Sequence, residues 1–341
     1  MSGTSLDGVD LAIVKFKYFN KRWSYELLSS KTKKYSIEWV KKLKKGVNLN
    51  KVNLSNLDND YTKYLALIIN NFISFADIKI DFVSSHGHTI IHNPKEGFTF
   101  QIGNNEKLAN LTCQSLICDF RIQDVLLGGQ GAPLVPAGDY HLFSDYTATL
   151  NIGGFANITK FYKSVIAYDI CPVNTVLNRL SNQLNVSFDD KGLIASSGNL
   201  IDNMLEDLNS LSFYNQPAPK SLGVEWVEEK INPIINKYKS YSVSDLLNTF
   251  VIHISSKIAD QLPLKGKVLL TGGGVYNEFL IELVKSKSNC ELIIPNSLLI
   301  EYKEAIIFAF LGVLRIRNEI NCFKSVTGAS MDHSSGTIYK K

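Results

Sequence analysis

The sequence predicts an α/β protein of two domains, and three observations lead to this fold class. The chain has 341 residues, which at about 150 residues per domain suits two domains. Hydrophobic residues make up 45% and charged residues 20%, as in packed globular proteins, which excludes a disordered or fibrous chain. Two strand–glycine turn–strand units, at 1–16 and 145–163, each open one half of the chain. This repetition suggests a duplicated architecture, with domains at 1–143 and 144–341 packed across a cleft.

Hydrophobic periodicity predicts the elements in order. Alternating or continuous runs of apolar residues predict an antiparallel pair at 9–16 and 23–28, and buried strands at 80–84 and 267–270. Apolar residues at helical spacing predict helices at 31–45, 56–76, 174–185, 198–210, 242–262, from about 277, and at 301–318. The helix at 31–45 carries seven lysines, which we interpret as a solvated face rather than a site for anionic surfaces.

Charge and cysteine content limit the partners. The net charge is only +4, which argues against nucleic acid as a partner. The five cysteines form no CxxC pair, which favours reduced thiols and a cytoplasmic location. No apolar run reaches about 18 residues and no signal peptide is evident, so we expect no membrane partner.

Glycines stand directly at strand ends in three places: 2–8, Gly153-Gly154 and Gly272-Gly273-Gly274. Such turns let a ligand approach backbone N–H groups closely, as phosphate sites require. One turn alone is a weak signal, whereas three predict phosphate binding. Asp7 lies in the first turn and is a candidate for binding Mg²⁺ through water, or an Asx-type turn residue. No GxxxxGK[ST] or GxSxG motif is present.

The motifs resemble, in order along nearly the whole chain, those of the anhydro-N-acetylmuramic acid kinases. The N-terminal segment from Met1 to Asp10 resembles the opening of that family. The motifs that follow are Ser85-His86-Gly87-His88-Thr89, Asp119-Phe120-Arg121, 128–136, 150–159, 271–274, Glu304-Ala305 and 326–329. The resemblance implies two actin-like ATPase (ribonuclease H-like) domains around a central cleft.

The implied activity is ATP-dependent opening and phosphorylation of 1,6-anhydro-N-acetylmuramic acid, giving N-acetylmuramate 6-phosphate in peptidoglycan recycling. By resemblance Asp169 is the base, and His86, Arg121, Asn174 and Glu304 contact the sugar. ATP and Mg²⁺ are the implied cofactors. A small-molecule sugar is the implied substrate, and a homodimer is the implied assembly. The residues expected to bind ATP are Gly3, Thr4, Ser5, Leu6, Asp7, Gly8, Val9, Asp10, Gly153, Gly154, Asn157, Gly272, Gly273 and Gly274.

Several alternatives stay open at this point. Asp169 also suits a helix N-cap before 172–180, and Glu304 suits a charge at the start of the last helix. The segment Asp169-Ile170-Cys171-Pro172-Val173-Asn174 departs from the family's Asp-Thr-Gly-Pro-Gly-Asn. A kinase for a related sugar, or a non-catalytic sugar- or nucleotide-binding homologue, is therefore an alternative. The family also places a short strand before the first turn, so we expect a strand upstream of Met1.

Overall fold

The computed structural model describes residues 1–3 and 6–341, which form two compact units. Unit 1 comprises Met1–Leu142 together with Tyr302–Lys341, and unit 2 comprises Phe143–Glu301. The mixed α/β class agrees with the prediction. The predicted second domain continued to residue 341, whereas Tyr302–Lys341 belongs to unit 1. The reason lies in pairing that local sequence does not reveal, because β12 (Thr337–Tyr339) is hydrogen-bonded to β6 (Leu116–Cys118).

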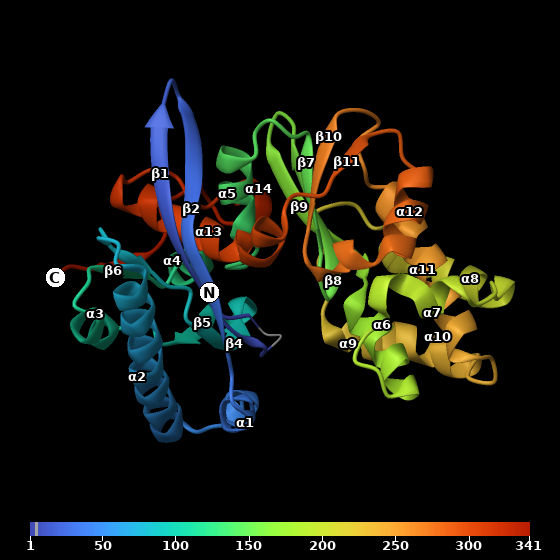
Figure 1. Ribbon diagram of the computed structural model, residues 1–341, viewed down its shortest axis with the longest axis horizontal. Coiled ribbons are helices and arrows are strands. Elements are labelled where there is room, and N and C mark those ends of the chain that lie inside the picture. The colour runs from blue at the N-terminus through green and yellow to red at the C-terminus, as the bar shows by residue number, and fades with distance from the viewer. Residues whose placement is uncertain (4–5) are drawn as a thin grey trace. The chain divides into compact units, whose positions relative to one another are not determined.

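Unit 2 is built on one five-stranded sheet with the order β11-β10-β7-β8-β9 (Figure 1). The three strands of the meander are antiparallel, whereas β10 and β11 run parallel to β7. This arrangement agrees with the ribonuclease H-like domain that the resemblance implies. The strands are β7 (Ala148–Ile152), β8 (Phe155–Phe161), β9 (Val165–Pro172), β10 (Lys267–Thr271) and β11 (Glu291–Ile293).

Helices cover the apolar face of this sheet and enclose the larger core. Every second residue of β7 is fully buried there, namely Ala148, Leu150 and Ile152, and they pack with Phe250 and Ile254. The helices of unit 2 are α6 (Asn174–Ser181), α7 (Leu193–Ser196), α8 (Asp202–Asn209), α9 (Val224–Trp226), α10 (Asn232–Lys237), α11 (Val243–Ala259) and α12 (Glu278–Ser286). The helices predicted at 174–185 and 242–262 are confirmed, with Ser242 as the N-cap of α11.

Unit 1 differs from unit 2 because its described strands fall into three sheets. A long antiparallel hairpin joins β1 (Gly8–Phe19) and β2 (Arg22–Lys34), as the sequence predicts. A second sheet has the order β12-β6-β3, and β4 pairs with β5 in a third. The remaining elements are β3 (Val83–Ser84), β4 (His88–Asn93), β5 (Phe98–Ile102), α1 (Ile37–Gly46), α2 (Lys51–Ala76), α3 (Glu106–Thr112), α4 (Ile122–Leu126), α5 (Val135–Leu142), α13 (Ser297–Ile316, which begins in unit 2) and α14 (Lys324–Thr327).

Element boundaries were predicted least well in unit 1. The helix expected at 31–45 begins only at Ile37, because Lys31 to Lys34 continue β2 by pairing with Leu11 to Gly8. The strand expected at 80–84 is limited to Val83–Ser84. The hairpin of β4 and β5 was not predicted, because polar residues at the strand ends interrupt the alternation of apolar and polar residues. Among the described residues, no helix is long and apolar enough to cross a membrane.

Gly272 and Gly273 offer a matched test of how unit 2 is assembled. Gly272 has φ +85°, and a Cβ there would lie 2.6 Å from the Ile152 carbonyl oxygen, whereas a Cβ on Gly273 would meet nothing within 4 Å. We therefore expect Gly272→Ala to lower the free energy of unfolding by about 1–3 kcal/mol. Gly273→Ala should change it by less than about 0.5 kcal/mol. Urea unfolding of both variants checks this, and equal losses would contradict the packing described.

Candidate functional site

The glycine turn after β7 holds the start of helix α6. The Gly154 carbonyl accepts hydrogen bonds from the backbone N–H groups of Val173 (2.8 Å) and Thr175 (3.2 Å) and from the Thr175 hydroxyl (2.9 Å). The Gly153 carbonyl accepts from the Asn174 N–H at 3.3 Å. The turn Gly153-Gly154 and the predicted sugar-binding residue Asn174 therefore lie together.

The second glycine turn of this unit follows β10 at the same sheet edge. Because β10 runs parallel to β7, with Thr271 opposite Asn151, the carboxyl ends of the two strands meet. Cβ atoms added at Gly272 and Gly274 would lie within 3 Å of Ile152, which shows how closely the turns approach. Open ends of parallel strands at one edge are where α/β sheets bind ligands. The geometry thus gathers Gly153, Gly154 and Gly272 to Gly274.

A row of polar residues crosses the sheet beside these turns. Asn151 on β7 lies opposite Asn157 on β8, which in turn lies opposite Asp169 on β9. Directly opposed residues share one face, and this face is opposite the one that carries Leu150 and Ile152. All three side chains are partly exposed. The prediction included Asn157 and Asp169 but missed Asn151, whose signal was a polar residue between two buried apolar ones.

Asp169 is held within β9 and not at a helix start. Its backbone N–H donates to the Lys220 carbonyl at 3.0 Å, and its Oδ2 accepts from the Leu222 N–H at 2.8 Å. The N-cap residue of α6 is Val173, so the N-cap alternative for Asp169 is wrong. Burial raises the pKa of Asp169 above its ordinary value, and the Leu222 hydrogen bond opposes the rise. A raised pKa suits a carboxylate that accepts a proton near neutral pH.

The residues that depart from the family pattern beside Asp169 belong to the core of unit 2. Ile170, Cys171 and Val173 expose 2% or less of their surface and pack within the same hydrophobic cluster. Burial raises the pKa of the Cys171 thiol, which keeps it protonated, as its interpretation as a packing residue requires.

The first glycine turn lies in unit 1 and runs into β1. Met1 and Asp10 exchange both backbone hydrogen bonds, at 2.7 and 2.8 Å, and these bonds hold the two ends of this loop together. Of the predicted ATP-binding residues, Gly3 and Leu6 to Asp10 lie on this loop and at the start of β1, whereas Thr4 and Ser5 lie outside the described residues. Asp7, the predicted Mg²⁺ residue, is exposed.

Buried hydroxyl and imidazole groups anchor this loop. The Ser2 hydroxyl lies 2.9 Å from His88 Nδ1 and 2.7 Å from the Tyr35 hydroxyl, which lies 2.6 Å from that of Tyr61. Burial lowers the pKa of His88 to about 4, so the ring is neutral at pH 7. His88 therefore has a positioning role at the first turn.

The predicted sugar-binding residues His86 and Arg121 bind each other. His86 Nε2 accepts from Arg121 Nε at 3.0 Å and lies 2.9 Å from Nη2, while Nδ1 lies 3.0 Å from the Gly87 carbonyl. The ring is thus neutral with the proton on Nδ1, and burial and the Arg121 charge hold its pKa well below the usual range. Burial lowers the pKa of Arg121 to about 10, and the carboxylate of Glu304 opposes this.

Glu304 does not open the last helix. It lies in the second turn of α13, which begins at Ser297, so the alternative of a charge at the helix start is wrong. The N-terminal ammonium group interacts electrostatically with both Glu304 and Asp10. Three of the four predicted sugar-binding residues, His86, Arg121 and Glu304, therefore lie in unit 1, and Asn174 lies in unit 2.

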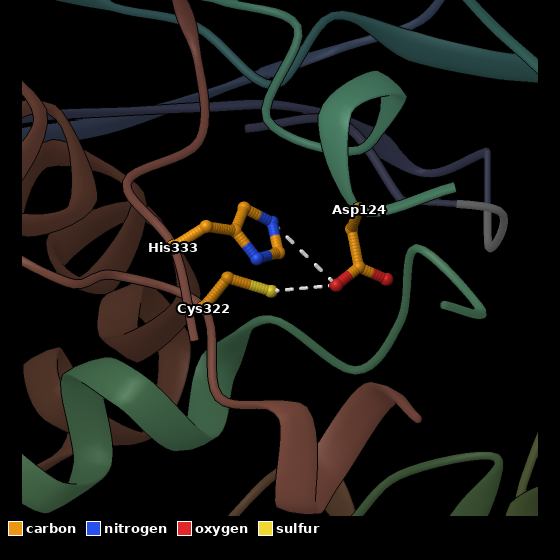
Figure 2. A group of neighbouring side chains, drawn as sticks. All are labelled: Asp124, Cys322 and His333. Atoms are coloured by element: carbon orange, nitrogen blue, oxygen red, sulfur yellow. Dashed lines mark hydrogen bonds and ion pairs between the residues drawn. The ribbon is translucent and has the colours of Figure 1, made fainter. Parts of the chain in front are cut away.

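A buried carboxylate next to Arg121 ties distant segments of unit 1 together. Asp124 Oδ1 accepts from the Thr327 hydroxyl (2.6 Å) and the Cys322 thiol (3.1 Å), and lies 3.6 Å from His333 Nε2 (Figure 2). Its Oδ2 accepts from the Gly131 N–H, and the Gly131 carbonyl accepts from Arg121, both at 2.6 Å. Asp124, Cys322 and His333 have the atoms for a metal site, but the chain already supplies the carboxylate with donors. We interpret the cluster as structural.

Comparison with known sequences identifies the family to which the chain belongs. The sequence profile of the family described as anhydro-N-acetylmuramic acid kinase matches residues 1–341. The chain belongs to the anhydro-N-acetylmuramic acid kinase family. Proteins of that name from Haemophilus influenzae and Francisella tularensis subsp. novicida are 32% and 33% identical to it, over 100% and 96% of this chain and 97% and 94% of theirs. One from Bacillus cereus is 30% identical over 99% of this chain and 97% of its own length.

Similarity to solved structures is much weaker than this family match. Component A of the (R)-2-hydroxyglutaryl-CoA dehydratase of Acidaminococcus fermentans aligns with a TM-score of 0.34 and 14% identity, over 51% of this chain and 63% of that one. The likeness is too loose to bear on fold or function. Membership of the anhydro-N-acetylmuramic acid kinase family rests on the sequence match.

His88 predicts how stability depends on pH. Its pKa is about 4 in the folded protein and about 6.5 when unfolded, so the unfolded state binds more protons between these values. Stability is therefore lost as pH falls from about 6.5 to 4, by up to roughly 3 kcal/mol. His88→Gln removes this loss, so its free energy of unfolding should fall less over that range. Urea unfolding at pH 7 and pH 4.5 checks this, and an unchanged acid loss would contradict the assignment.

Proposed function

We propose that this protein is an ATP- and Mg²⁺-dependent kinase that hydrolytically opens 1,6-anhydro-N-acetylmuramic acid and phosphorylates it on O6. The observation that carries the proposal is the family match along residues 1–341. The polar row of unit 2 supports it, since it sets a carboxylate of raised pKa beside two glycine turns. The product would be N-acetylmuramate 6-phosphate, as peptidoglycan recycling requires, in the cytoplasm.

The glycine turns have the properties that a nucleotide site needs. A Cβ on Gly273 would meet nothing within 4 Å, so open space lies in front of that turn. We propose that ATP is held by Gly3 to Asp10, Gly153, Gly154, Asn157 and Gly272 to Gly274, and that Asp7 holds Mg²⁺ through water. Bound Mg-ATP would supply the phosphoryl group and offset its charge. The backbone amides of the glycine turns and the Asp7 carboxylate would position the bound Mg-ATP.

Asp169 is the proposed general base. Its Oδ2 is occupied by the Leu222 N–H, whereas Oδ1 has no partner among the described residues and remains for a water molecule. Oδ1 would take a proton from that water, and the resulting hydroxide adds to the anomeric carbon. The C1–O6 bond of the anhydro bridge breaks, and the freed O6 accepts the phosphoryl group. His86, Arg121, Asn174 and Glu304 are proposed to orient the sugar.

The departures Ile170, Cys171 and Val173 first suggested a kinase for a related sugar. Their side chains pack in the core of unit 2, so these departures do not by themselves argue for a different sugar. The remaining alternative is a non-catalytic sugar- or nucleotide-binding homologue. It differs from the kinase in one measurable property, because it would bind the sugar or ATP without releasing ADP.

Turnover should depend on the anhydro sugar. We expect ADP release from Mg-ATP to rise at least about tenfold over the sugar-free rate with 1,6-anhydro-N-acetylmuramic acid, and not with N-acetylmuramic acid, which lacks the bridge. A coupled ADP assay measures the rate, and phosphorus NMR identifies the 6-phosphate. Ligand binding without ADP release would overturn the proposal in favour of the binding homologue.

Asp169→Asn should lower kcat by about 10²–10⁴ while leaving the fold intact, because the amide cannot take the proton. Asp202→Asn, at the exposed first turn of α8, is the matched control and should retain full activity. In the wild type, activity should fall as pH drops through the raised pKa of Asp169. An Asp169→Asn enzyme with unchanged kcat and the same acid limb would exclude this base.

A further inference from the structure

The proposed base Asp169 lies beside a loop that takes the place of a neighbouring strand. Strand β9 is at the edge of the sheet in unit 2, and the segment 210–223 connects α8 to α9. Within this segment the Lys220 carbonyl accepts from the Asp169 N–H, and the Leu222 N–H donates to Asp169 Oδ2. The direction in which the Asp169 carboxylate points therefore depends on where this loop lies.

The Lys220 side chain ties the loop together. Its ammonium nitrogen donates to the Phe213 carbonyl at 3.0 Å and to the Tyr214 carbonyl at 3.3 Å, and it lies 4.6 Å from the centre of the Phe213 ring. Hydrogen bonds from a charged donor are stronger than neutral ones, and an ammonium over an aromatic ring adds to them. These contacts fix the part of the loop that touches Asp169 relative to Phe213 and Tyr214.

Phe213 and Tyr214 are in turn anchored to the core of unit 2. Phe213 is buried, and the Tyr214 hydroxyl lies 3.0 Å from Nε2 of His253, a fully buried residue of α11. His253 Nδ1 lies 3.0 Å from Asn209 Oδ1, which can only accept, so Nδ1 carries the proton and Nε2 accepts from Tyr214. Burial lowers the pKa of His253 to about 3, so the ring is neutral at pH 7. Lys220 thus connects Asp169 to a fixed point in the core.

The geometry favours an effect of Lys220 on Asp169 through the loop over one through charge. Burial raises the pKa of Asp169, and the influence that opposes the rise is the Leu222 hydrogen bond. The Lys220 ammonium itself is directed to the carbonyls of Phe213 and Tyr214. What reaches the carboxylate is the position of the Leu222 N–H, which occupies Oδ2 and leaves Oδ1 without a partner among the described residues.

We propose that Lys220 is a positioning residue for Asp169, because its ammonium holds the loop where the Leu222 N–H anchors Oδ2 and leaves Oδ1 for the attacking water. This inference rests on the proposed function, in which Asp169 is the general base. A carboxylate with one oxygen anchored presents the other in a fixed direction before any substrate arrives.

Lys220→Met tests the proposal, because methionine has nearly the same length but cannot donate. Lys257→Met is the matched control, since the Lys257 ammonium lies in the same region but faces the Tyr214 ring, 5.1 Å from its centre. We expect Lys220→Met to speed hydrogen exchange of the Leu222 amide by at least about tenfold, and Lys257→Met by less than about twofold. The amides of α11 should keep their protection in both variants, which shows that the core is intact.

A milder variant keeps the test decisive should Lys220→Met lose protection throughout α11. Lys220→Gln retains a donor group and should speed exchange of the Leu222 amide by a smaller factor. Unchanged exchange at Leu222 in these variants would overturn the proposal, as would an equal acceleration by Lys257→Met. Because this readout does not use turnover, it is separate from sugar-dependent ADP release, whose absence in the wild type would instead overturn the proposed function.

Kinetics of a double variant test whether this position matters to the reaction. Lys220→Met should lower kcat by about ten- to hundredfold and change KM for ATP by less than about twofold, because a displaced base slows the chemical step. In an Asp169→Asn background, Lys220→Met should lower kcat no further, since residues that act as one unit are not additive. An unchanged kcat in Lys220→Met, or losses that multiply in the double variant, would exclude the positioning role.

Discussion

The parallel pairing of β10 with β7 is the constraint on which the proposed catalytic machinery of unit 2 depends. It places the carboxyl ends of two strands, separated by more than a hundred residues of chain, at one sheet edge. The turn after β10 then requires glycine, since Cβ atoms at Gly272 and Gly274 would collide with Ile152. The same sheet carries Asn157 and Asp169 in one row, so backbone pairing alone sets the distance between the glycine turns and the proposed base.

In unit 1 the proposed site residues are positioned by side-chain hydrogen bonds, whereas in unit 2 they are positioned by the pairing of strands in one sheet. Gly131 is fixed by Arg121 through its carbonyl and by Asp124 through its N–H, and Asp124 also binds Thr327 and Cys322 from the C-terminal segment. This explains why that segment belongs to unit 1. The arrangement also restrains Arg121, which His86 accepts from the other side, so two of the proposed sugar-binding residues are oriented before any ligand arrives.

Each unit begins with a glycine turn that leads into a strand, but the units differ in how their described strands are joined into sheets. In unit 2 the strand before the glycine turn is β7, which lies in the middle of the sheet. In unit 1, among the described strands, β1 pairs with β2 alone, and an apolar cavity of about 860 Å³ lies along it.

The sequence by itself determined the fold class, the family, the glycine turns and the strong periodic elements such as α2, α11 and β10, because these depend on local pattern and motif order. The tertiary structure decided what depends on pairing between distant segments. It moved Tyr302–Lys341 into unit 1, placed Asp169 inside β9 and not at a helix cap, added Asn151 to the polar row, and directed Ile170, Cys171 and Val173 into the core. Strand register and the face on which a side chain lies follow from long-range hydrogen bonds, and no local window of sequence contains both partners.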